Sequence, residues 1–240
     1  MEKTIRQKIH NLRKKFHEKI TDFSLVKKAI IAVIPGYLGL LILGVIIAFL
    51  FGGTSQGPGE YYIWTNWISD LGGSPYTPAP FLYDIACILA GILTIPLTFY
   101  LEAKFAPLPK DSNDLINCSR LRYRLASYAF LFSLIGNVGY MGVGIFSEDR
   151  NFFNLHVFTS SLAFGGFTFA AFFFGLMVIL YIRDIPNWLG LYGVIGPMTV
   201  IILFGIFGGP LFEWLLLFSI LAWIIPLSIY IMRNEEQTSK

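Results

Sequence analysis

Long apolar runs alternate with short polar segments along most of the chain. A helix needs about 20 apolar residues to cross roughly 30 Å of hydrocarbon, and six runs reach that length. These runs cover residues 29–51, 80–101, 123–146, 155–182, 188–207 and 211–232. Because lipid cannot satisfy free backbone N–H and C=O groups, each run is predicted to be helical. The pattern therefore predicts an all-α, polytopic membrane bundle with six transmembrane helices across residues 29–232.

Residues 1–28 show a different pattern, in which basic residues surround a regular apolar series. The series recurs at spacings of three and four, as on one face of a helix, and consists of Ile5, Ile9, Leu12, Phe16, Ile20 and Phe23. Such a helix can lie in the headgroup plane, with its charges near anionic lipid. We therefore expect residues 4–23 to form an amphipathic cytoplasmic helix on an anionic leaflet. The alternative is a topology signal that happens to be helical.

Composition agrees with a membrane protein. Charged residues make up 14% of the chain and hydrophobic residues 55%, whereas an average soluble domain is about a quarter charged. The basic residues also fix an orientation. If both termini are cytoplasmic, Arg150 is the only one of the 18 Lys and Arg residues outside, as the positive-inside rule requires. The sequence predicts a multi-pass protein of the cell membrane, with residues 233–240 as a short cytoplasmic tail.

The outer side then carries mainly acidic residues, concentrated in two segments. The first is 69-SDLG-72, before the second span, and the second is 147-SEDRNFFNLH-156, between the third and fourth spans. Asn151 or Asn154 is expected to cap the fourth span with a side-chain oxygen. Carboxylates at Glu148 and Asp149 are favoured near the positive end of that helix.

A candidate ligand-binding site follows from these two segments and from polar residues at the span ends. Its members are Ser69, Asp70, Asp84, Glu148, Asp149, His156 and Ser160. Asp84 lies inside the second span, where an unpaired charge costs roughly 2.5–3.5 kcal/mol or more. His156 opens the fourth span, and Ser160 follows one turn later on the same face. We consider a pair between Asp84 and His156: if the two side chains meet, the carboxylate would favour the protonated imidazole, and the pair would be sensitive to pH near neutrality.

Two blocks, residues 66–93 and 142–164, resemble the prokaryotic six-span family called domain of unknown function 998. The family's first element matches at Ser69, Asp70, Leu71 and Gly72. Its second element matches at Gly144, Ile145, Phe146, Ser147, Glu148, Asp149, Leu155 and His156, with serine at 147 where proline is expected. The arrangement is more remotely similar to the DRAM/Frag/Sfk six-span group, some of whose members are linked to lipid handling. The resemblance implies the six-span plan and the place of a site, and it assigns no reaction.

Three functions remain open on the sequence. In a structural function, Asp70, Glu148, Asp149, Arg150 and His156 form a latch between the outer loops, buried under Trp64 and Trp67. In a binding or transport function, the same pocket recognises a small ligand, namely a cation, an amine or a lipid headgroup, and the helices move a substrate.

In a hydrolase function, His156 acts as a general base or joins the carboxylates on a divalent metal, and Ser69, Ser147 or Ser160 is the nucleophile. His10 and His17 lie in the basic arm, so a multi-histidine zinc site is excluded, and no H-E-x-x-H or G-x-S-x-G motif occurs. Binding or a structural function is therefore favoured over catalysis. We expect no metal, cofactor or nucleic acid, and the oligomeric state is left open.

Overall fold

A computed structural model describes residues 2–52, 61–107 and 119–238 of the 240-residue chain. Within these ranges the chain is helical and forms no strand. The helices are α1 (Glu2–Ile20), α2 (Phe23–Phe51), α3 (Phe81–Phe105), α5 (Arg120–Ile145), α6 (Leu155–Tyr181), α7 (Asn187–Phe207) and α8 (Pro210–Thr238). Three short 3₁₀ helices lie between them: η1 (Ile68–Gly72), η2 (Glu148–Arg150) and η3 (Phe152–Asn154).

All helices from α2 to α8 are long and apolar enough to cross a membrane. The prediction of an all-α, multi-pass membrane protein with six spans is confirmed. The largest difference is at two span ends, where polar residues extend helices beyond the apolar runs. α2 begins at Phe23 because Asp22 caps it, accepting a hydrogen bond from Leu25 N–H at 3.3 Å. α8 runs past its apolar stretch to Thr238.

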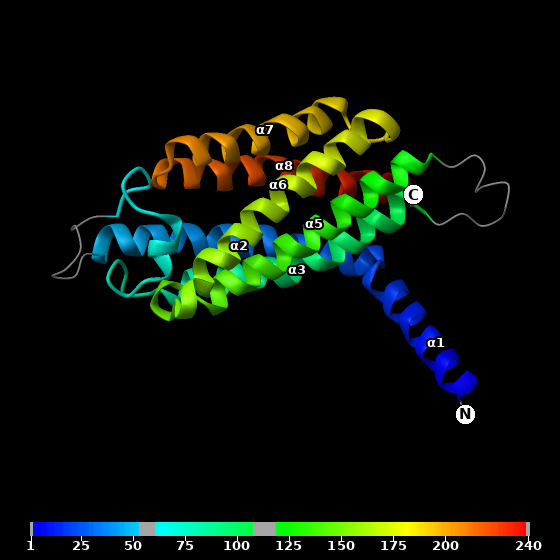
Figure 1. The fold of residues 1–240 in the computed structure, drawn as a ribbon, viewed down its shortest axis with the longest axis horizontal. Coiled ribbons are helices and arrows are strands. Elements are labelled where there is room, and N and C mark those ends of the chain that lie inside the picture. Colours follow the sequence, from blue (N-terminus) through cyan, green and yellow to red (C-terminus); the bar gives the residue numbers. More distant parts are fainter. Residues whose placement is uncertain (1, 53–60, 108–118, 239–240) are drawn as a thin grey trace.

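Helices that follow one another in the sequence pack side by side, in the order α2, α3, α5, α6, α7 and α8. α6 crosses the bundle obliquely and links α5 to α7, while α7 and α8 lie along one side (Figure 1). α2 and α8 make few contacts with each other. The six helices therefore form a ring that is weakly closed between its first and last members.

The closest helix packing joins α5 to α6, through small residues on facing sides. A Cβ added to Gly139 would lie 2.5 Å from the backbone nitrogen of Ala163, and one added to Gly142 would lie 2.5 Å from the side chain of Thr159. Small residues allow this approach, which dispersion forces then stabilise within lipid. α5 and α6 thus form the most closely packed pair of helices. The segment that joins them, residues 146–154, carries most of the second polar segment.

Both termini lie at the same end of the bundle (Figure 1). There α8 is joined to α2 by an ion pair between Lys27 and Glu236 at 2.5 Å, and to α3 by one between Lys104 and Glu235. The opposite end carries residues 61–80 and 146–154 and is called the loop end below. The sequence predicts that the acidic Glu60 lies on the outer side and the basic Lys110 on the cytoplasmic side, and both lie outside the described residues.

The amphipathic helix predicted near the N-terminus is confirmed as α1, although it ends at Ile20 and not at residue 23, because Asp22 caps α2 and Phe23 begins that helix. It points away from the six-helix bundle (Figure 1), and its apolar residues Ile9, Leu12 and Phe16 are each more than half exposed. The ring of Phe16 makes an edge contact with Phe99 of α3. Apart from that contact, the apolar face of α1 packs little against the described part of the bundle.

Candidate functional site

The two polar segments of the loop end lie against each other. Asp149 accepts hydrogen bonds from the backbone N–H of Ser74, at 2.9 Å to each carboxylate oxygen, and from the Ser74 hydroxyl at 3.1 Å. These bonds join η2 to the loop that follows η1. They are charge-assisted and so stronger than bonds between neutral groups. Asp149 therefore fixes the spacing between the two segments.

Asp84 pairs with Arg150 and not with His156. The guanidinium Nη2 of Arg150 lies 2.5 Å from Asp84 Oδ2 and also donates to the carbonyl of Gly144 at 3.1 Å. Its Nε donates to the carbonyl of Ile145, also at 3.1 Å. The hypothesis that Asp84 pairs with His156 was wrong, because Arg150, with its five donors, bonds Asp84 Oδ2 and the last carbonyls of α5 together, while Asp84 Oδ1 is buried without a hydrogen-bond partner among the described residues.

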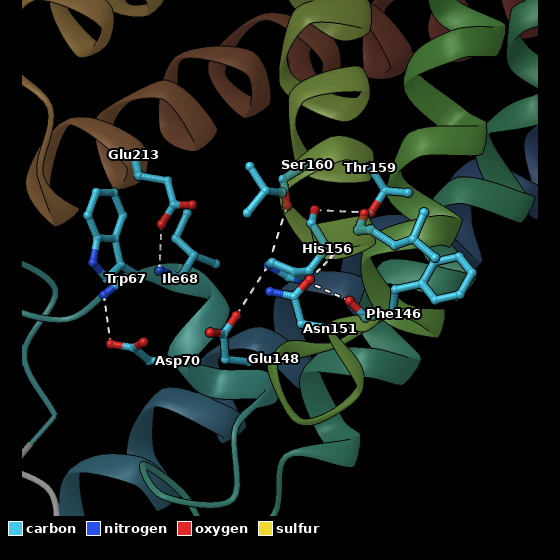
Figure 2. Close-up of polar contacts among 12 residues, drawn as sticks. Trp67, Ile68, Asp70, Phe146, Glu148, Asn151, His156, Thr159, Ser160 and Glu213 are labelled. Atoms are coloured by element: carbon cyan, nitrogen blue, oxygen red, sulfur yellow. Dashed lines mark hydrogen bonds and ion pairs between the residues drawn. The ribbon is translucent and has the colours of Figure 1, made fainter. Parts of the chain in front are cut away.

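His156 is buried at the start of α6, with each ring nitrogen in a different environment (Figure 2). Nδ1 lies 2.7 Å from the carbonyl oxygen of Phe146. Since a carbonyl only accepts, Nδ1 carries the hydrogen, and Nε2 is left as an acceptor in the neutral ring. Nε2 lies 3.4 Å from Ser160 Oγ and 4.0 Å from Glu148 Oε2.

Asn151 caps α6, as one of the two predicted alternatives. The backbone N–H of His156 donates to Asn151 Oδ1 at 3.1 Å. Asn154 makes no side-chain capping bond and lies in the left-handed region with φ of 59°, next to Phe153 with φ of 52°. Two residues with the left-handed backbone conformation, which residues other than glycine seldom adopt, thus precede α6.

Asp70 serves its own loop and takes no part in a latch with the second segment. Its Oδ2 accepts from the backbone N–H of Trp67 at 3.0 Å and from Asn66 Nδ2 at 3.3 Å. Burial raises the pKa of the Asp70 carboxyl, because lost hydration disfavours the charge more than the two bonds, from Asn66 and Trp67, favour it. Ser69 is half-buried in η1 and takes no part in these bonds.

The loop of residues 61–72 is tied to α8. Glu213 is buried and accepts from the backbone N–H of Ile68 at 2.7 Å, and Trp214 Nε1 donates to the carbonyl of Asn66 at 3.1 Å (Figure 2 draws the first of these bonds). The expected burial of the latch under Trp64 and Trp67 was wrong, since Glu148, Asp149 and Arg150 are exposed. Trp64 and Trp67 are themselves 60% and 38% exposed. The aromatic residue that closes this end is Trp214, which reaches under the loop from α8.

An apolar cavity lies inside the ring, between α2 and α8, and was not predicted from the sequence. Its volume is about 80 Å³, and it is lined mainly by aliphatic and aromatic side chains of α2, α3, α6 and α8. It adjoins an apolar groove of about 500 Å³ along the outside of α2 and α8. Cavity and groove share Leu38, Leu221 and Ile225. The interior is thus separated from the surrounding lipid by few side chains.

Polar groups beside this cavity are paired with one another. Asn137 of α5 accepts from the Thr94 hydroxyl at 2.6 Å and donates to Thr98 at 3.1 Å, and the hydroxyls of Tyr37 and Tyr140 bond to each other. Such pairing is what buried polar groups within a membrane require. The cavity therefore offers an apolar surface with its few polar neighbours already satisfied.

No group of three or more His, Cys, Asp and Glu side chains suited to a metal ion occurs among the described residues. Comparison of the chain with family models, curated proteins and solved structures finds no match to any of them. The site is therefore interpreted from its own geometry.

Proposed function

We propose that this protein binds a lipid, with an acyl chain in the cavity and groove between α2 and α8. The observation that carries the proposal is the apolar cavity that opens sideways where the helix ring is weakly closed. The six apolar spans support a position of this opening within the bilayer hydrocarbon. Acyl chains are the apolar molecules present there, and a mostly apolar lining suits them.

The carboxylates of the loop end support a structural role in this function. Asp149 holds the two segments together, Asp84 is paired with Arg150, and Glu213 binds the Ile68 N–H. Since their hydrogen bonds are directed at other parts of the chain, they act as the latch that keeps the helix ends in place around the lipid. The resulting assignment is a binding or membrane-organising protein more than a transporter.

Retention of lipid by the purified protein tests the proposal. Full-length protein is purified in mild detergent, and bound lipid is quantified by mass spectrometry. We expect the wild type to retain about one lipid per chain and Ile225→Trp, which fills the shared wall of cavity and groove, to lose most of it. Ile202→Trp is the matched control, because Ile202 faces outward on α7. Lipid-free wild type, or equal retention by Ile225→Trp, would contradict the proposal.

We also propose that both termini are cytoplasmic in the cell membrane and that α1 lies on the inner, anionic leaflet. The basic residues that surround its exposed Ile9, Leu12 and Phe16 support this placement. Membership of the family called domain of unknown function 998 is a further proposal, supported by the motifs at residues 69–72 and 144–156.

A further inference from the structure

Three consecutive hydroxyl residues in α6 make different hydrogen bonds. Thr159 donates to the carbonyl of Leu155 and Ser161 to the carbonyl of Val157, both at 2.8 Å. This bond to the preceding turn is the usual one for a hydroxyl inside a helix. Ser160 differs, because its Oγ lies against the imidazole Nε2 of His156 at 3.4 Å (Figure 2). The Ser160 hydroxyl is thus directed toward a base.

The surroundings of His156 suit its action as a base toward Ser160. The Phe146 carbonyl holds the hydrogen on Nδ1, so the Nε2 lone pair faces Ser160 in the neutral ring. Glu148 Oε2 lies 4.0 Å from the same nitrogen. Its carboxylate is placed to stabilise the imidazolium that forms when His156 takes up a proton. A hydroxyl, a base with a fixed tautomer and a carboxylate are among the groups that nucleophilic catalysis by serine uses.

The position of Ser160 suggests the substrate class. His156, Ser160 and Phe164 follow one another at intervals of four residues, on one face of α6. Phe164 lines the apolar cavity, and Ser160 lies one helical turn nearer the loop end and is partly exposed. A lipid with its acyl chain in the cavity would place its ester group at about the level of Ser160, since headgroups lie toward the bundle ends.

We propose that Ser160 is a nucleophile and His156 its general base in the hydrolysis of a lipid carboxylic ester, with Glu148 as a positioning residue. Ser160 Oγ bonds to the ester carbonyl carbon while its proton passes to His156 Nε2. The ester C–O bond breaks, and the leaving alkoxide takes that proton from Nε2. Water, deprotonated by Nε2, then attacks the acyl-serine, which releases the carboxylic acid and restores Ser160. The substrate class rests on the proposed lipid site.

Labelling with a fluorophosphonate probe tests the nucleophile in the full-length protein in detergent. We expect covalent labelling at Ser160, located by peptide mass spectrometry, and none at that position in Ser160→Ala. His156→Gln keeps an amide donor for the Phe146 carbonyl, so it should fold and yet label at least tenfold more slowly. Ser161→Ala is the matched control and labels as the wild type does. An unlabelled Ser160 in the wild type, or an unchanged rate in His156→Gln, would overturn the proposal.

Turnover of p-nitrophenyl butyrate, a short-chain ester, separates this proposal from lipid binding. We expect Ser160→Ala to lose turnover and Glu148→Gln to lower kcat several-fold with KM unchanged, as a positioning role requires. Ile202→Trp, on the outward face of α7, is the control and should keep both the retained lipid and the probe labelling. Labelling without lipid retention would reject the lipid site alone, and lipid retention without labelling would reject the serine nucleophile alone.

Discussion

Arg150 is the residue on which the arrangement of the loop end depends. It contacts the buried carboxylate of Asp84 and the last carbonyls of α5, Gly144 and Ile145. Replacing either partner of the Asp84–Arg150 pair leaves the other without its counterion, which destabilises the fold. We predict that Asp84→Asn and Arg150→Gln each lower the unfolding temperature, and that their effects are coupled by about 1–2 kcal/mol in a double-mutant cycle.

A second cycle provides the control. Asp84→Asn and His156→Ala should be additive, because these side chains have different partners. Coupling between Asp84 and His156 as large as that between Asp84 and Arg150 would show that the pairing is assigned to the wrong residues.

Asp70 gives the loop end a pH dependence. Its pKa is higher in the folded protein than in the unfolded chain, because burial disfavours the charge. Its stabilising contribution is therefore present at low pH and is lost as the pH rises through the folded-state pKa. We predict that Asp70→Asn, which keeps an oxygen for the Trp67 N–H, reduces the fall in unfolding temperature between pH 4 and pH 7. Identical slopes for wild type and variant, measured by thermal denaturation in detergent, would refute this assignment.

For single residues, the sequence predicted which side chains need a partner, but it predicted less well which residues supply that partner. That Asp84 required a counterion followed from the cost of an unpaired charge in lipid. Which residue supplies it depended on how the chain turns after α5, and that turn brings Arg150 back over Ile145. The Asn151 cap was predictable because capping is local, whereas the bond from Ser74 to Asp149 joins residues that nothing in their spacing connects.

Among the helices, the contact between α5 and α6 is the one most sensitive to side-chain size. A Cβ on Gly139 would meet the backbone of Ala163 at 2.5 Å, and helix backbone cannot move aside as a flexible side chain can. We predict that Gly139→Ala destabilises the protein by about 1–3 kcal/mol, as overpacking of a close contact does. Gly165→Ala on α6 is the control, since a Cβ there meets nothing within 4 Å. Equal unfolding temperatures for the two variants would contradict the close contact.

α1 is the helix whose apolar face is left largely unpacked by the bundle. Basic side chains near an anionic surface contribute about 1 kcal/mol each, and the exposed Ile9, Leu12 and Phe16 can enter the acyl boundary. We predict that a peptide of residues 4–23 becomes helical, by circular dichroism, with anionic vesicles and much less so with neutral ones. Leu12→Glu should weaken the response, and a peptide that stays unstructured with both vesicle types would leave the arm as a charge signal.

The helices themselves were predictable because membrane insertion depends on the apolar character of whole segments, summed over some 20 residues. Their ends shifted where a single polar residue decided the boundary, as Asp22 does for α2. The opening between α2 and α8 could not be predicted in this way. It depends on how far two distant spans approach each other, and hydropathy does not encode that distance.

For the whole molecule, the orientation in the membrane is the property that decides which solution meets the loop end. Phe153 of the loop end is 98% exposed, and Gln7 on α1 is exposed at the opposite end. In a background without Cys118, we predict that Phe153→Cys reacts with a membrane-impermeant maleimide added to intact cells. Gln7→Cys should react only after permeabilisation. The reverse pattern of labelling would invert the topology and place the loop end in the cytoplasm.

The weakly closed side of the ring lies between α2, the first of the six spans to be synthesised, and α8, the last. Until α8 leaves the ribosome, the cavity wall formed by α2, α3 and α6 faces the bilayer directly. In the lipid-binding proposal, an acyl chain therefore occupies this wall during translation, and α8 docks over it. Glu213 and Trp214 at one end and Glu235 and Glu236 at the other then hold α8 in place. In that proposal the first lipid is consequently acquired during biogenesis, from the bilayer in which the chain is made.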